Sequence, residues 1–489
     1  IHCCNSAMDC SRRITTGFVL SNTVNVVMTV IQLSYQPSEN IGMDRSAGVA
    51  VDWGGTLSDR GISQSGKLAV RMRETDILTA SLKQPTDMPL VVDLDGTLSV
   101  ADTLVEALTT LFLRRPAALP GMLAALLKGR QVLKDYLVRS GCYQSEHVPL
   151  REDLLRFLVE QHEAGREIHL VTASPQSVAD AIASRVGIFT SAVGSTRTIN
   201  LKGSAKLSRL KEMFPNGFIY AGNDRSDVAI WRESQGVIVA GSQAGVVREA
   251  GQLGVPVKAY FPDQKISLRD WAKAVRMHQW VKNALMFVPL VLSHQYGDPV
   301  AFGKIMLGFI CMGLVASATY LLNDLSDLSA DRRHHSKRQR PLASGLVSAQ
   351  RAIAVGMALG LIGLTGAFAL NLWFAMQVLA YVALTLAYSL RLKAVAMLDV
   401  FALGMLFTLR ILMGATILGI VMSPWLLVFS MFFFFSLSTA KRHVEIVRAV
   451  QRGETGRING RGYQVEDAPL TLALGIASSL AATTLMFLY

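Results

Sequence analysis

The sequence predicts two dissimilar parts, an α/β domain followed by an all-α polytopic membrane bundle. In residues 88–275, short apolar strands end in polar or acidic residues and alternate with helical stretches. In residues 283–489, apolar runs of about 17 to 25 residues recur, which is the length of membrane helices. The chain is 51% hydrophobic and 17% charged over 489 residues. It is therefore too apolar for an ordinary soluble protein of this size.

The net charge of +12 does not indicate binding to nucleic acid. The basic residues of the second half lie between apolar runs, a distribution that favours membrane topology and anionic substrates. Three of the five cysteines lie within the first ten residues, and the other two are far apart. This spacing supports neither a disulfide framework nor a zinc site. No oligomeric state is indicated.

Composition suggests four segments. Residues 1–87 show no clear periodicity and are expected to be an untranslated or disordered leader, with the true start near Met72 or Met88. Residues 88–250 form the α/β domain, and residues 251–275 are expected to be a linker. Residues 276–489 form the membrane bundle, which stops inside an apolar run and is therefore interpreted as C-terminally truncated.

The first strand of the α/β domain ends in two carboxylates. Leu90-Val91-Val92-Asp93-Leu94-Asp95-Gly96-Thr97 is an apolar run followed by acids and a turn. Open α/β sheets bind ligands at this edge. Asp93 is suited to attack a phosphoryl group and Asp95 to transfer a proton, while Gly96 allows the backbone to approach the phosphate.

Three later features follow in the same domain. Thr172 ends a second strand and is suited to bind phosphate, Lys206 is suited to neutralise charge, and Asp227 follows a third strand. This order resembles the haloacid dehalogenase-like phosphatases, which have a Rossmann-like fold. The resemblance implies a helical cap at about 101–166 and Mg²⁺ bound by Asp93, Asp95 and Asp227. Asn223 departs from it, because the family has an Asp there; a regulatory domain with little turnover is the alternative to a phosphatase.

Seven apolar runs follow Lys282, at roughly 283–296, 303–322, 350–368, 372–390, 397–420, 423–440 and 470–489. The connections between them alternate between loops rich in Lys and Arg and loops that lack both. Under the positive-inside rule, every basic loop and the α/β domain face the cytosol. We therefore expect a multi-pass protein of a bacterial-type cytoplasmic membrane, with its active site and α/β domain on the cytosolic side.

An acidic segment follows the second apolar run. Asp324, Asp327 and Asp331 stand at i, i+3 and i+7, so on a continuous helix they lie within about 60° of one face. Asn323 borders this face, and His334 joins it if the helix continues. Lys337 and Arg340 follow and are suited to phosphate oxygens. The pattern predicts a site for a Mg²⁺–diphosphate at the mouth of the bundle.

Other charged residues are expected at the same face of the membrane. Lys282 precedes the first run, Asp399 lies beside the turn between the fourth and fifth runs, and Lys441-Arg442-x-x-Glu445 follows the sixth. Arg410 lies within an apolar run and needs a partner there, and Asp399 is the nearest acid in the sequence. The alternative for Arg410 is that its side chain extends to the interface.

Asn323-Asp324-x-x-Asp327-x-x-x-Asp331, with Lys337, Arg340 and Pro341, resembles the first Asp-rich motif of the UbiA-type prenyltransferase superfamily. The resemblance covers about 270–489 and implies a helical membrane enzyme of about nine spans. It also implies that Mg²⁺ binds through Asp324, Asp327 and Asp331, with diphosphate displaced and Asp399 near the developing cation.

One branch of the superfamily is a closer match. Gln279-Trp280-Val281-Lys282-Asn283, the run from Asp331 to Pro341 and Lys441-Arg442-x-x-Glu445 resemble decaprenyl-phosphate phosphoribosyltransferases. That branch implies phosphoribosyl diphosphate as donor and a polyprenyl phosphate as acceptor. The usual second Asp-rich motif is absent, which disfavours a prenyl diphosphate as the donor. The alternatives are prenyl transfer from a prenyl diphosphate to an aromatic or other acceptor, a membrane-tethered phosphatase, and a lipid transporter.

Overall fold

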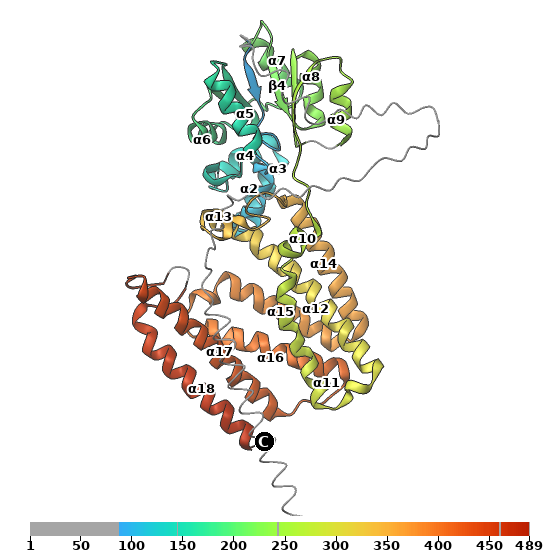
Figure 1. Cartoon of the computed structure of the whole chain (residues 1–489), viewed down its shortest axis with the longest axis vertical. Helices are drawn as coiled ribbons and strands as arrows, with labels where there is room; N and C mark the ends of the chain where they lie inside the picture. The colour runs from blue at the N-terminus through green and yellow to red at the C-terminus, as the bar shows by residue number, and fades with distance from the viewer. Residues whose placement is uncertain (1–87, 144, 242–243, 459–460, 489) are drawn as a thin grey trace, which may run out of the picture. The chain divides into compact units, whose positions relative to one another are not determined.

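The structure is a computed structural model that describes residues 88–143, 145–241, 244–458 and 461–488 (Figure 1). The expected leader, residues 1–87, lies outside the described residues. The first described part is an α/β domain and the second is a helical bundle, which confirms the predicted fold class.

A parallel six-stranded sheet with the order β3-β2-β1-β4-β5-β6 forms the centre of the α/β domain. The strands are β1 (Leu90–Val92), β2 (Ile168–Pro175), β3 (Ser191–Ser195), β4 (Ile219–Gly222), β5 (Gly236–Ala240) and β6 (Val257–Phe261). Leu90 and Val92 point into one hydrophobic core and Val91 into the other. Helices cover both faces, so β1 must be apolar on both sides.

The chain order around β1 explains where the polar residues gather. From β1 the sheet continues through β2 to β3 on one side, and the chain then returns to place β4 on the other side. Val92 pairs with Ala221 in register, so the residues after β1 and those after β4 emerge at the same edge. This is the topological switch point at which open α/β sheets bind ligands.

The helices of the α/β domain have two different packing roles. They are α2 (Thr103–Arg114), α3 (Leu119–Leu127), α4 (Arg130–Arg139), α5 (Glu152–Glu163), α6 (Gln176–Val186), α7 (Ser204–Met213), α8 (Val228–Glu233) and α9 (Ala244–Gly251). α2 and α4 share a small core built on Ala107, Leu111 and Leu137. By contrast, α5 packs Leu154 and Leu158 into the core of the sheet. The segment expected to be a cap therefore contains one helix that belongs to the sheet layer.

The expected linker at 251–275 is wrong as a structural description. It contains β6, which pairs with β5, and α10 (Leu268–Ala274), which has a Ser267–Asp270 capping box. β6 is an edge strand with a mostly exposed Val-Lys-Ala-Tyr-Phe sequence. An edge strand does not need a continuous apolar run, because one of its sides lacks a neighbouring strand.

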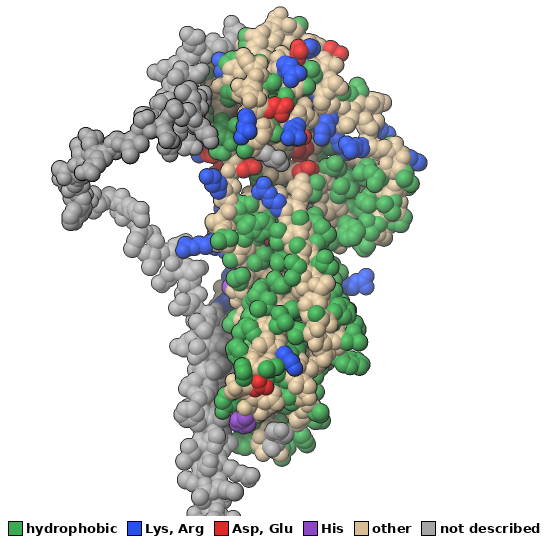
Figure 2. Space-filling view, turned by 90° about the vertical axis from the view of Figure 1, so that its right-hand side faces the viewer, with side chains coloured by type: hydrophobic (Ala, Val, Ile, Leu, Met, Phe, Trp, Pro, Cys, Tyr) green, Lys and Arg blue, Asp and Glu red, His purple; other side chains and the backbone are tan. Residues whose placement is uncertain are grey.

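The bundle contains six helices, within the described residues, that are long and apolar enough to cross a membrane. They are α12 (Pro299–Ser326), α14 (Ala349–Leu370), α15 (Leu372–Leu390), α16 (Leu398–Leu418), α17 (Pro424–Gln451) and α18 (Ala468–Leu488). Figure 2 shows hydrophobic side chains over most of the visible face of this bundle. Such a surface is stable in lipid and costly in water, so the chain is an integral membrane protein.

The first of the seven expected runs takes another form. It lies in a 3₁₀ helix, η4 (Met277–Phe287), and in the short α11 (Val288–Leu292). Neither element is among the six helices long and apolar enough to cross a membrane within the described residues, so the structure gives six of the seven expected runs this form. A Cβ at Gly414 of α16 would lie 2.0 Å from the Met286 carbonyl oxygen, so glycine allows this close approach.

The loops give a testable orientation. We expect a single cysteine at Ser336, in the basic loop, to react with a membrane-impermeant maleimide only from the cytosolic side. A cysteine at Gly297, which lies in a loop without Lys or Arg, should react only from the opposite side, because basic loops stay in the cytosol. Labelling of intact cells and inverted vesicles, in a background lacking the native cysteines, measures both. The reverse pattern would refute the orientation.

Candidate functional sites

The phosphatase-like site forms where β1 and β4 end. The Lys206 ammonium of α7 donates hydrogen bonds to Asp93 Oδ1 at 2.9 Å and to the Tyr220 hydroxyl at 3.0 Å. Tyr220 in turn donates to Asp227 at 3.0 Å. Burial raises the pKa of Asp93, and Lys206 opposes the shift by favouring the charged carboxylate.

Asp95 is held by the element that follows it. Its Oδ1 accepts the Thr103 backbone N–H at 2.8 Å, and its Oδ2 accepts the Ser174 hydroxyl at 2.6 Å. Burial raises the pKa of Asp95. The Thr172 hydroxyl oxygen accepts a hydrogen bond from the Ser174 backbone N–H at 3.0 Å. A raised carboxyl pKa suits the proton-transfer role expected for Asp95.

These side chains do not fit a metal ion in their present arrangement. Asp227 Oδ2 accepts the backbone N–H groups of Asn223 and Asp224 at 2.9 and 3.0 Å. The Asn223 side chain accepts from Thr97 at 3.2 Å. Within the described residues, no group of three or more His, Cys, Asp or Glu side chains is arranged to hold a metal.

Sequence reasoning missed two polar residues at this site. Ser174 lies two residues beyond the expected Thr172 and contacts Asp95 directly. Lys134 of α4 donates to the Ala173 carbonyl and to Asn200 at 2.5 and 3.0 Å. Burial lowers the pKa of Lys134. Lys134 sits on a separate helix with no local motif, so only the packing of α4 against β2 brings it here.

In the bundle, two of the three acidic residues converge. Arg340 donates to Asp331 at 2.5 Å and to Asp324 at 3.2 Å, and Arg276 also pairs with Asp324. Asp324 and Asp331 are buried, with 6% and 4% of their surface exposed. Buried carboxylates need such partners, and the two arginines balance their charge.

Asp327 does not share this site, which corrects the one-face expectation. α12 ends at Ser326, Asp327 has non-helical dihedral angles, and α13 (Leu328–Arg333) begins after it. The break turns Asp327 towards Lys393 at 3.8 Å and Arg114 at 3.3 Å. His334 does not join the acidic face either, because α13 ends at Arg333 and His334 is exposed.

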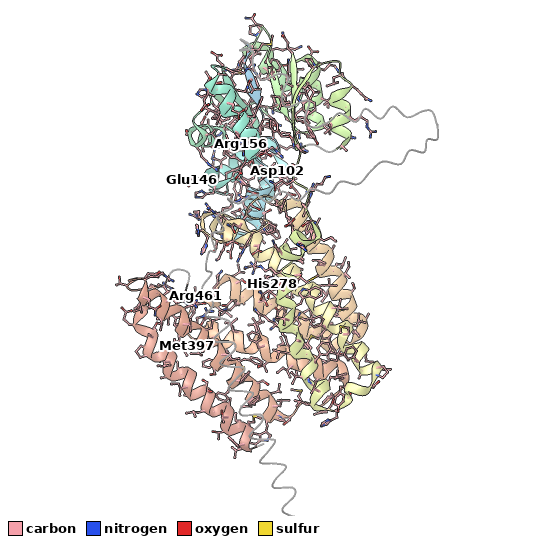
Figure 3. The ribbon with its side chains drawn as sticks, viewed as in Figure 1. Asp102, Glu146, Arg156, His278, Met397 and Arg461 are labelled. Carbon is pink, nitrogen blue, oxygen red and sulfur yellow. The ribbon has the colours of Figure 1, made fainter. Side chains whose placement is uncertain are left out.

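A cavity of about 390 Å³ opens beside this acidic pair. Its walls include Arg276, Asp324, Arg340 and His278, which is labelled in Figure 3. Lys337 is 45% exposed at its side chain and lies 3.9 Å from Asp331. Neither Asn323 nor the exposed Lys282 lines this cavity. The volume falls in the range of small-molecule sites.

A second charged cluster lies between the α15–α16 turn and the end of α17. The Arg442 guanidinium donates to Asp399 and to Glu445, each at 2.5 Å, and to the Tyr388 hydroxyl at 3.1 Å. The Tyr463 hydroxyl donates to Asp399 at 2.6 Å. Asp399 and Arg442 are almost fully buried, at 0% and 2% exposure.

Two loops complete this second cluster. Arg461 pairs with Glu445 at 3.5 Å, and the Met397 N–H donates to the Tyr463 hydroxyl at 3.0 Å. Figure 3 labels Arg461 and Met397. Lys441, expected in the same site, is exposed. The positive charge that faces Asp399 therefore comes from Arg442.

Arg410 has other partners than the expected Asp399. It donates to Asn283 at 3.0 Å, to the Tyr381 hydroxyl at 3.0 Å and to the Leu406 carbonyl at 2.5 Å. Its guanidinium also lies over the Tyr381 ring, 4.9 Å from the centroid. Neutral oxygens and an aromatic face thus solvate this buried cation. Asp399 and Arg410 lie at opposite ends of about three turns of α16, about 16 Å apart along the helix axis, so their side chains do not meet.

Residues 284–487 match the UbiA prenyltransferase family, and residues 90–232 match the haloacid dehalogenase-like hydrolases. The uncharacterized protein y4nM of Sinorhizobium fredii is 43% identical over 403 residues, which cover 82% of this chain and 78% of y4nM. The C-terminal part of the chain is a UbiA prenyltransferase family domain. The N-terminal part is a haloacid dehalogenase-like domain.

Two further likenesses concern the UbiA-type domain. The decaprenyl-phosphate phosphoribosyltransferase of Mycobacterium tuberculosis is 33% identical over 195 residues, which cover 39% of this chain and 65% of that enzyme. A solved UbiA homolog from Archaeoglobus fulgidus, bound to GPP and Mg²⁺, is 19% identical with a TM-score of 0.36. That match covers 44% of this chain and 76% of the homolog.

The Asp399–Arg442 pair gives a stability prediction. Replacing Arg442 with alanine leaves a buried carboxylate without its cation and should destabilise the bundle by about 3–5 kcal/mol. Thermal unfolding of the purified protein in detergent measures this. The matched control is Arg452→Ala in the same region, where Arg452 and Glu454 are exposed and the expected change is below about 1 kcal/mol. Equal effects of the two variants would contradict the structural role of Arg442.

Proposed function

We propose that this chain displaces diphosphate from phosphoribosyl diphosphate and joins the phosphoribosyl group to a polyprenyl phosphate, with Mg²⁺ as cofactor. The observation that carries the proposal is the convergence of Asp324 and Asp331 on Arg340 beside a cavity of about 390 Å³. The site would face the cytosol, where the donor is soluble. The likeness to a decaprenyl-phosphate phosphoribosyltransferase supports this choice of substrates.

The charges around the cavity support a cation that arrives with the diphosphate. Arg276 and Arg340 offset the charges of Asp324 and Asp331, so a diphosphate would add negative charge that these residues leave uncompensated. Mg²⁺ is commonly held by one or two carboxylates together with substrate phosphates and water. Asp324 and Asp331 fit this role, and Asp327 is oriented elsewhere. Bound there, Mg²⁺ would neutralise charge on the leaving group.

The second cluster favours phosphoribosyl diphosphate over a prenyl diphosphate as donor. Asp399 and Glu445 are the acids nearest to the position of the usual second Asp-rich motif. Both pair with Arg442, so neither carboxylate is free to bind a second metal ion. The partly exposed Arg461 of this cluster and the exposed Lys441 are better suited to an additional phosphate than to an apolar prenyl chain. Phosphoribosyl diphosphate carries such a phosphate, and a prenyl diphosphate does not.

In the proposed reaction the bond from the anomeric carbon to the diphosphate oxygen breaks, and its electron pair leaves with the diphosphate. An oxygen of the polyprenyl phosphate forms the new bond to that carbon. Arg276 and Arg340 would bind the departing oxygens, and Lys337, 3.9 Å from Asp331, would add a third positive charge beside the acidic pair. Asp399 is hydrogen-bonded to Arg442 and Tyr463, and these contacts would hold the start of α16 in place beside the site.

Asp324→Asn should lower transfer at least about 100-fold, since it removes charge from the group that positions the leaving diphosphate. Membrane insertion should be unchanged. The matched control is Asp298→Asn at the opposite end of α12, where asparagine still caps the helix and activity should persist. Transfer in isolated membranes is the measurement. Wild-type activity in Asp324→Asn would refute the site.

The donor is tested separately by supplying membranes with a polyprenyl phosphate and either labelled phosphoribosyl diphosphate or a labelled prenyl diphosphate. We expect lipid-linked label and diphosphate release only with phosphoribosyl diphosphate and Mg²⁺. Asp324→Asn membranes are the control for background labelling. Label transferred from the prenyl diphosphate to an aromatic acceptor would favour the alternative prenyl-transfer function.

A second candidate function is phosphate-ester hydrolysis by the α/β domain. The observation in its favour is Asp93 at the switch point, hydrogen-bonded to Lys206. If this domain turns over, Asp93→Asn should abolish release of inorganic phosphate from a phosphomonoester and leave diphosphate release by the bundle intact. Phosphate release that persists in Asp93→Asn would exclude this site as its source.

A further inference from the structure

Helix α2 belongs to the phosphatase-like domain and also contacts the acidic segment of the bundle. Its first residue, Thr103, is fixed by Asp95, which accepts the Thr103 N–H at 2.8 Å. The Thr103 hydroxyl also lies 2.7 Å from that of Ser174. The start of α2 is therefore part of the phosphatase-like site.

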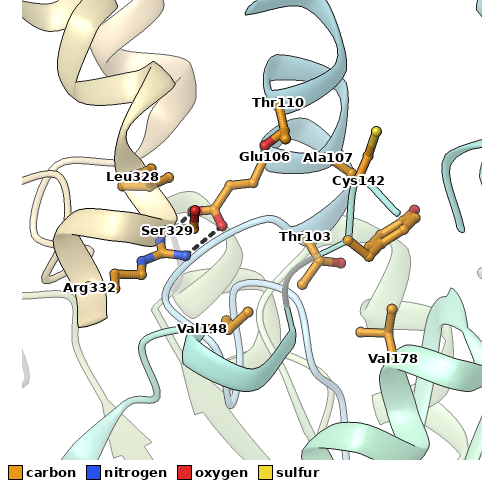
Figure 4. Close-up of a pocket in the computed structure, with 11 residues that line it drawn as sticks. Thr103, Glu106, Ala107, Thr110, Cys142, Val148, Val178, Leu328, Ser329 and Arg332 are labelled. Carbon is orange, nitrogen blue, oxygen red and sulfur yellow. Dashed lines mark hydrogen bonds and ion pairs between the residues drawn. The ribbon is translucent and has the colours of Figure 1, made fainter. Parts of the chain in front are cut away.

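One turn further along α2, Glu106 forms an ion pair with Arg332 of α13. The two carboxylate oxygens of Glu106 accept from Nη1 and Nη2 of Arg332 at 2.8 and 2.6 Å (Figure 4). Both side chains are largely buried, at 14% and 6% exposure. A bidentate pair of this kind fixes orientation as well as distance. Arg332 Nε also donates to the Ala343 carbonyl at 3.2 Å, so the same side chain joins α13 to the basic loop that follows it.

The C-terminal end of α2 contacts the chain at the start of α13. Arg114 donates to the Ser326 carbonyl at 2.6 Å and to Asp327 at 3.3 Å, where α12 breaks and α13 begins. α13 has only six residues, too few to be a stable helix by itself. Contacts from outside must therefore fix its position, and α2 supplies one at each end.

We propose that Glu106 is a positioning residue for the transferase site, acting through Arg332 to fix α13 and the Asp331 that α13 carries. The inference rests on the proposed function, since it assigns Asp331 to the diphosphate site. Asp331 directly precedes Arg332, so a shift of the guanidinium moves the backbone that aims the carboxylate at Arg340. Small displacements of this kind weaken ligand binding markedly. The phosphatase-like domain thus forms part of the transferase even without turnover of its own.

The kinetic test uses the full chain in membranes. Glu106→Ala should raise the KM for phosphoribosyl diphosphate about tenfold, while the KM for polyprenyl phosphate changes less than about threefold. Glu106→Gln, which keeps the shape and loses the charge, should show an intermediate increase. The control is Glu233→Gln in the same domain, whose exposed pair with Lys211 lies outside both sites and should leave all constants unchanged.

A charge exchange separates positioning from a general loss of structure. Arg332→Glu alone should raise the KM for the donor as Glu106→Ala does, and the double variant Glu106→Arg/Arg332→Glu should recover it to within about threefold of wild type. An unchanged donor KM in Glu106→Ala would overturn the inference. Equal changes in both KM values with a lower unfolding temperature would also overturn it, because they indicate only lost stability.

The outcome for Asp324→Asn keeps the two proposals apart. Loss of transfer in Asp324→Asn together with normal kinetics in Glu106→Ala would refute the positioning role alone. Wild-type transfer in Asp324→Asn would refute the proposed diphosphate site itself, and the role of Glu106 with it.

Discussion

Buried carboxylates at the end of a membrane bundle must each have a cation, and this requirement organises the structure. Asp324, Asp331 and Asp399 are almost inaccessible, and an uncompensated charge in such a place costs several kcal/mol. Their partners come from distant parts of the sequence. Arg276 lies before the first long helix of the bundle, and Arg340 follows α13. These ion pairs hold the segments that carry Arg276 and Arg340 against the end of α12, where both arginines form part of the wall of the 390 Å³ cavity.

The same pairs explain how a site for a highly charged ligand remains stable without it. In the structure, Arg276 and Arg340 satisfy the acids that the proposal assigns to Mg²⁺ binding. On this proposal, a ligand that brings both negative phosphates and a divalent cation would allow these partners to be exchanged, with the arginines pairing with phosphate and the carboxylates with the metal. The site would then avoid an unpaired buried charge in both states.

The two domains are linked by more than the chain that connects them. A single helix, α2, has its first turn in the phosphatase-like site and its later turns on α13. This arrangement gives the α/β domain a structural reason to be part of a transferase. It holds whether Asn223 and the hydrogen-bonded Asp227 permit turnover or leave a domain that only recognises phosphate.

The sequence by itself determined the two fold classes and predicted seven apolar runs, of which six are long membrane helices in the structure. It also singled out many of the charged residues that gather in the two domains as candidates. The length of an apolar run, and an apolar strand followed directly by acidic residues, can both be read from neighbouring positions in the sequence. Asp93, Lys206, Asp324, Arg340 and Arg442 were all named as candidates in this way.

Only the tertiary structure decided which of these residues meet. The helix break at Asp327 separates it from Asp324 and Asp331, although their spacing fits one helical face. Asp399 binds Arg442 rather than Arg410, and the expected linker holds the edge strand β6. The Glu106–Arg332 pair joins residues 226 positions apart. Charge pairing over such separations depends on packing and burial, which no local pattern records.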